Sequence, residues 1–114
     1  MQTNVVTLKD IIKIIKEKDI VSFSAKWKPS LAWMADGDGW APIHFAAAYG
    51  NPEIIERILE KDQQKWIENR TDDHGFTPLL LAAKYKNYEA LKTLLSFGAD
   101  SKAVTFEGEE IGRA

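Results

Sequence analysis

The chain contains no cysteine, which excludes disulfide bonds, thiolate catalysis and zinc sites built on sulfur ligands. It has no apolar run close to the roughly 20 residues that a membrane-crossing helix needs. Its start, MQTNVVTLKD, has neither the basic segment nor the apolar segment of a secretory signal. We therefore expect an intracellular chain without membrane insertion, in the cytoplasm, with the nucleus as the alternative.

An excess of charge of one sign is also missing. The 15 basic and 17 acidic residues leave a net charge of -2, which offers no electrostatic reason to expect nucleic acid or an anionic membrane as partner. An early group of lysines is either a local basic patch or, as we favour, the solvated face of a helix. These lysines are Lys9, Lys13, Lys16 and Lys18.

What the chain does have is an internal repeat. The segment DGDGWAPIHFAAAYGNPEIIERILE, which begins at Asp36, aligns without a gap with DDHGFTPLLLAAKYKNYEALKTLLS, which begins at Asp72. The matching positions lie 36 residues apart throughout. They pair Gly39 with Gly75, Trp40 with Phe76, Pro42 with Pro78, Tyr49 with Tyr85 and Asn51 with Asn87.

Each copy reads as a turn followed by two helices. Glycine followed by proline marks the turn, and Thr77 can cap a helix that has Pro78 in its first turn. A pair of alanines keeps this helix thin enough for close neighbours. The helix breaks at Lys86-Asn87, where we expect asparagine to take the left-handed conformation. Apolar residues at helical spacing then predict second helices over 52–60 and 88–96.

These residues resemble the ankyrin repeat family. The marks are Gly75-Phe76-Thr77-Pro78-Leu79 with Ala82-Ala83 and Gly98-Ala99-Asp100, and the weaker copy that starts at Gly39. The resemblance implies an all-α solenoid of stacked helix-turn-helix units joined by hairpin loops. Ankyrin units recur at about 33 residues. The longer spacing here therefore predicts an insertion in 61–71, which carries Trp66 as a wedge between helices or as a second surface.

We divide the single domain, 1–114, into four parts. Residues 1–35 would form two helices broken near Lys18-Asp19 and serve as an N-terminal capping unit. Full repeats occupy 36–71 and 72–104, and 105–114 form an incomplete unit or tail. Because the last full repeat lacks a complete cap, we expect the chain to be a fragment of a longer protein. The alternatives are that Phe106 and Ile111 cover this end or that a partner packs against it.

No residue pattern indicates catalysis or a cofactor. An EF-hand loop that began at Asp36 would need glycine sixth and glutamate twelfth, but Ala41 and Ala47 stand there. We interpret Asp36 to Gly39 as a hairpin turn, and His44 as a structural histidine rather than a ligand or base. No nucleophile stands beside a base. We expect no metal, no cofactor and no enzymatic activity.

The resemblance implies that function lies on the concave surface, as an adaptor, scaffold or inhibitor that binds another protein or a peptide segment. The alternative is a regulatory segment of a larger enzyme, channel or receptor whose main interface is its C-terminal end. Aromatic side chains that stacking does not need would anchor a partner. They could instead pack inward or on one another. The expected partner-binding residues are Asp38, Trp40, Tyr49, Asp73, His74, Phe76, Lys84 and Tyr85.

Overall fold

The helices of the chain are arranged in pairs. A computed structural model describes residues 6–60 and 70–102, and the described residues contain six α-helices, a short 3-10 helix and no strand. The predicted second helices at 52–60 and 88–96 are confirmed at both ends. The elements are α1 (Leu8–Lys16), α2 (Ile20–Lys26), η1 (Pro29–Trp33), α3 (Pro42–Tyr49), α4 (Pro52–Glu60), α5 (Pro78–Lys84) and α6 (Tyr88–Ser96).

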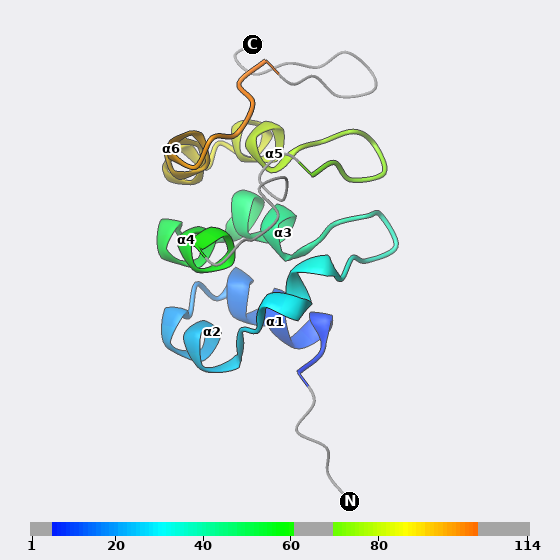
Figure 1. The fold of residues 1–114 in the computed structure, drawn as a ribbon, viewed down its shortest axis with the longest axis vertical. Helices are drawn as coiled ribbons and strands as arrows, with labels where there is room; N and C mark the ends of the chain where they lie inside the picture. The colour runs from blue at the N-terminus through cyan, green and yellow to red at the C-terminus, as the bar shows by residue number, and fades with distance from the viewer. Residues whose placement is uncertain (1–5, 61–69, 103–114) are drawn as a thin grey trace, which may run out of the picture.

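The pairs α1–α2, α3–α4 and α5–α6 stack on one another along the long axis of the molecule (Figure 1). The first helices of the pairs, α1, α3 and α5, form one column, and α2, α4 and α6 form the other. The chain segments that precede α3 and α5 project as long loops from the same side of the stack (Figure 1). The predicted all-α solenoid of helix-turn-helix units is therefore confirmed. The unit boundaries remain predictions, and residues 61–69 and 105–114, with Trp66, Phe106 and Ile111, lie outside the described residues.

Close stacking of the first column depends on the small residues of α3. Every residue from Pro42 to Ala48 is buried, and Ala46 and Ala47 have no exposed surface at all. A helix that is apolar on all sides must be covered on all sides. It lies between α1 and α5, so the paired alanines allow both neighbours to approach.

The second helix of each pair begins at a side-chain cap. The carboxylate of Asp19 and the amide oxygens of Asn51 and Asn87 each accept a hydrogen bond from the backbone N–H three residues later. The expectation that Asn87 takes the left-handed conformation is wrong, since its φ is -87°. Lys86 has that conformation instead, with a φ of 57°. Asn87 is excluded from it because its side chain is used for capping.

Asn87 also ties two pairs together. Its Nδ2 atom donates hydrogen bonds to the carbonyl oxygens of Ala47 and Gly50, each at 3.0 Å. Both carbonyls lie at the C-terminal end of α3, where helical carbonyls lack partners within the helix. One side chain thus caps α6 and satisfies the end of a helix in the preceding pair.

We expect Asn87→Ala to lower the free energy of unfolding by about 2–3 kcal/mol, because it removes two partly buried hydrogen bonds and a helix cap. Asn51→Ala is the matched control. It removes the cap of α4 alone and should cost about 1 kcal/mol. Urea unfolding followed by circular dichroism measures both. Equal losses for the two variants would contradict a linking role for Asn87.

Candidate partner-binding surface

The loops before α3 and α5 are hairpin turns of the same construction. An Oδ1 atom of Asp36 accepts hydrogen bonds from the backbone N–H groups of Asp38 and Trp40, both at 2.9 Å. Asp72 does the same 36 residues later for His74 and Phe76. The two aspartates are therefore occupied in shaping the turns, and the interpretation of the aspartate-glycine stretch as a turn is confirmed.

The two hairpins contact each other. The backbone N–H of Asp73 donates to the carbonyl oxygen of Asp38 at 3.0 Å. Gly39, with a φ of 80°, sits at this contact, and a β-carbon there would lie 2.5 Å from Oδ1 of Asp73. Glycine is thus required both for the backbone angle and for the close approach. The side chains of Asp38, Asp73 and His74 are exposed on the hairpins, as expected.

His44 lies at the base of the first hairpin and is fully buried. Its Nδ1 atom accepts a hydrogen bond from the backbone N–H of Ala41 at 3.0 Å, so the ring is neutral and Nε2 carries the proton. Nε2 donates to the carbonyl oxygen of Arg70, 3.0 Å away, on the chain that leads into the next hairpin. Burial lowers the pKa of His44 below its ordinary value of 6.5. The prediction of a structural histidine is confirmed.

Three rings from two helix pairs form an aromatic cluster: Trp40, Tyr49 and Tyr85. The ring centroids of Tyr49 and Tyr85 are 5.3 Å apart, and those of Trp40 and Tyr85 are 6.0 Å apart, both in edge-to-face geometry. Hydrogen bonding with Tyr49, followed by burial, raises the pKa of Tyr85 above its ordinary value of 10.0. The cluster joins the end of the first hairpin to the C-terminal ends of α3 and α5.

The rings of this cluster are only partly free. Tyr85 is 41% exposed, whereas Trp40 and Tyr49 are half-buried and pack against the core. The alternative in which Tyr49 and Tyr85 pack on each other is therefore observed, and this contact joins the α3–α4 pair to the α5–α6 pair. Trp40 takes part in the stacking, contrary to the expected free aromatic stripe, because it touches Phe45 of α3 as well as Tyr85 of the next pair.

Phe76 departs furthest from the expected exposed stripe. It is 9% exposed and belongs to the hydrophobic core, so the ring itself offers little surface. The ammonium group of Lys84 lies 4.7 Å from its centroid. Lys16 covers Tyr49 in a similar way, at 5.2 Å. An ammonium over a ring face is held by the negative charge of the ring quadrupole, so each lysine is placed over an aromatic residue at this surface.

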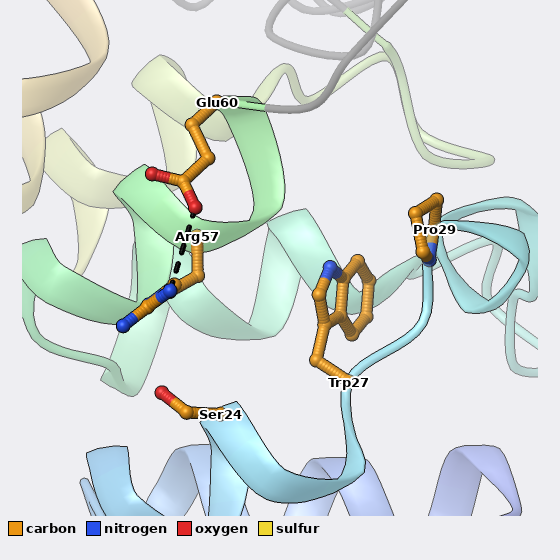
Figure 2. Close-up of a pocket in the computed structure, with 5 residues that line it drawn as sticks. All are labelled: Ser24, Trp27, Pro29, Arg57 and Glu60. Carbon is orange, nitrogen blue, oxygen red and sulfur yellow. Dashed lines mark ion pairs between the residues drawn. The ribbon is translucent and has the colours of Figure 1, made fainter.

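A separate pocket of about 200 Å³ opens between α2, η1 and α4. Trp27 and Pro29 form one wall, and Ser24, Arg57 and Glu60 line the rest (Figure 2). The guanidinium of Arg57 pairs with the carboxylate of Glu60 at 3.5 Å. Because the charges that line the pocket neutralise each other, we assign no ligand to it.

Within residues 6–60 and 70–102, no group of three or more histidine, aspartate or glutamate side chains is placed to hold a metal ion. No helix in this part of the chain is long and apolar enough to cross a membrane.

Comparison with known proteins decides the family. The family model for ankyrin repeats in three copies matches residues 8–105, which include all three helix pairs. The chain belongs to the ankyrin repeat family. The α1–α2 pair, in which the sequence motif is weakest, lies inside the matched region. Ankyrin repeats are protein-interaction modules.

The chain is similar to part of several longer proteins. The chain is 36% identical over 78 residues to the human ankyrin and armadillo repeat-containing protein, and the aligned region is 68% of the chain but 5% of that protein. It is 45% identical over 75 residues to bovine ankyrin repeat and SOCS box protein 3, covering 65% of the chain and 14% of the relative. It is 40% identical over 62 residues to the human transient receptor potential cation channel subfamily A member 1, and the aligned region is 54% of the chain and 6% of the channel protein. The chain thus spans a small part of each relative.

The structure shows two contacts at this surface that the sequence does not predict, the contact of Lys16 with Tyr49 and the link from Asn87 to α3. The sequence predicts that Lys16 lies on a solvated helix face with the other early lysines, and that Asn87 is a turn residue. The position of each lysine within its repeat is a signal that the sequence does contain. Lys16 and Lys84 both stand three residues before the cap of the following helix, Asp19 and Asn87.

The buried histidine predicts how stability depends on pH. Because the pKa of folded His44 lies below 6.5, the unfolded chain binds this proton at a higher pH than the folded chain does. The contribution of neutral His44 to the free energy of unfolding is therefore complete above about pH 6.5, and it is lost as the pH falls toward the pKa of the folded state. The slope should reach at most about 1.4 kcal/mol per pH unit.

Urea unfolding between about pH 7 and pH 5, a range above the ordinary pKa values of carboxyl groups, measures this slope. His44→Gln keeps one donor and one acceptor without a group that titrates there, so the slope should flatten. His74→Gln changes an exposed histidine and should leave the slope as it is. An unaltered slope in His44→Gln would show that another group causes the pH dependence.

Proposed function

We propose that this chain is a protein-binding module that holds an extended segment of a partner against the aromatic cluster, as an adaptor, scaffold or inhibitor does. We place it inside the cell, in the cytoplasm or, alternatively, the nucleus. The other members of the proposed surface are Asp38, Asp73, His74, Phe76 and Lys84 around the cluster.

The observation that carries the proposal is the position of Tyr85. Its ring is 41% exposed, yet Trp40 and Tyr49 hold it on two sides. A ring that is fixed before binding loses little conformational entropy when a partner covers it. Tyrosine and tryptophan are also the residue types that most often supply the binding energy of interfaces. Catalysis has no comparable support among the described residues.

The second candidate is a regulatory segment of a larger enzyme, channel or receptor. The small share of each relative that the chain covers favours it, and one of these relatives is a cation channel. In that case the main interface would lie at the C-terminal end. The exposed apolar side chains Tyr88, Leu95 and Phe97 of α6 and its cap would take part in it.

A peptide-display selection on the intact chain tests the first candidate. For a selected peptide, Tyr85→Ala should weaken binding about tenfold or more, because it removes a pre-positioned anchor ring. Tyr88→Ala is the matched control, since Tyr88 is 60% exposed on α6 and outside the cluster. Calorimetric titration gives the affinities, and thermal melting checks that each variant remains folded.

The same titration separates the two candidates. If Leu95→Ser with Phe97→Ser abolishes binding while Tyr85→Ala leaves it intact, the C-terminal interface is the correct one. If peptides are selected but none depends on Tyr85, the aromatic cluster is not the binding surface.

A further inference from the structure

The two lysines over the aromatic rings occupy equivalent positions. Lys16, Ala48 and Lys84 each stand three residues before the cap of the next helix, in α1, α3 and α5 respectively. These helices form one column of the stack (Figure 1). Along the column, a lysine is followed by an alanine and then by a second lysine.

Among the described residues, neither ammonium group has a carboxylate partner. The ion pair in that part of the chain joins Arg57 to Glu60 on α4, which belongs to the other column. Lys16 and Lys84 instead lie over the rings of Tyr49 and Phe76, at 5.2 and 4.7 Å. A ring face satisfies an exposed ammonium only weakly, so both charges are available to a stronger anion.

The middle of the column is apolar. Ala48 is 6% exposed and presents a short side chain between the two lysines. The next position in the column carries an exposed acid, Glu17, in the first pair, and Tyr49 and Tyr85, which belong to the aromatic cluster, in the other two. The surface therefore presents a positive charge at each end and an apolar, aromatic centre.

From this arrangement we infer that the partner is an acidic protein segment. Two carboxylates would pair with Lys16 and Lys84, and an apolar side chain between them would pack against Ala48 and the tyrosines. This inference rests on the proposed function of the aromatic cluster and adds the chemistry of the partner.

The repeat geometry sets the spacing of the two acids. Packed helices lie about 8–10 Å apart, so two steps along the column separate the backbones of Lys16 and Lys84 by roughly 16–20 Å, and their flexible side chains can follow the acids of a bound segment. An extended chain advances about 3.3 Å per residue. The acidic residues should therefore stand about five residues apart. Asp38 and Asp73 on the hairpins carry negative charge beside the same surface, which disfavours a continuous polyanion such as nucleic acid.

Three heptapeptide display libraries test the inference on the intact chain. All have random central positions, and they differ in positions one and six, which are fixed as glutamate, glutamine or lysine. We expect enrichment from the glutamate library, with affinities that fall as salt rises from about 0.05 to 0.5 M. Lys16→Gln with Lys84→Gln should weaken the selected peptides about tenfold. Lys26→Gln with Lys92→Gln, the same charge change on α2 and α6, should not.

Other outcomes would overturn the inference. Enrichment from the glutamine or lysine library, with binding that still depends on Tyr85, would refute the acidic partner and leave the proposed function standing. If no library yields a peptide whose binding depends on Tyr85, both are refuted. Binding to vesicles that contain phosphatidylserine, lost in Lys16→Gln with Lys84→Gln, would assign the lysines to a membrane surface instead.

Discussion

The packing of α3 between α1 and α5 is the interaction on which the rest of the structure depends. Each neighbour covers one side of a helix whose residues from Pro42 to Ala48 are all buried. Apolar burial stabilises this contact in proportion to area but does not fix its direction. The alanines let the helices come close, and the loss of either neighbour would expose a helix with no polar side. The hairpin before α3 and the tyrosine at its C-terminal end take their positions from this helix.

Polar links supply the direction that apolar packing lacks. His44 joins the start of α3 to Arg70, Asn87 joins the start of α6 to the end of α3, and Asp73 joins one hairpin to the other. Hydrogen bonds require particular distances and angles, so these contacts hold the repeats in one register. Among the described residues no buried side-chain nitrogen or oxygen lacks a partner, which means that the links add specificity without leaving polar groups unsatisfied.

The aromatic cluster combines a structural contact with an open surface. Trp40 and Tyr49 are half-buried against the core, and the same contacts hold the exposed ring of Tyr85 in place. The rings thereby couple the stability of two neighbouring repeats to the shape of their shared face. In the function proposed above, a ring held by its neighbours in this way loses little conformational entropy when a partner covers it.

By itself the sequence determined the repeat, the helices at 52–60 and 88–96, and the hairpin turns, because caps, turn glycines and apolar spacing act between residues close together in the chain. Only the tertiary structure decided that Phe76 is buried, that Lys86 rather than Asn87 has the positive φ, and that Lys16 covers Tyr49. The contact of Lys16 with Tyr49, like the bond from Asn87 to Ala47, joins segments more than 30 residues apart. Asn87 and Lys16 each contact a residue of a neighbouring repeat, and the local sequence around them does not contain that residue.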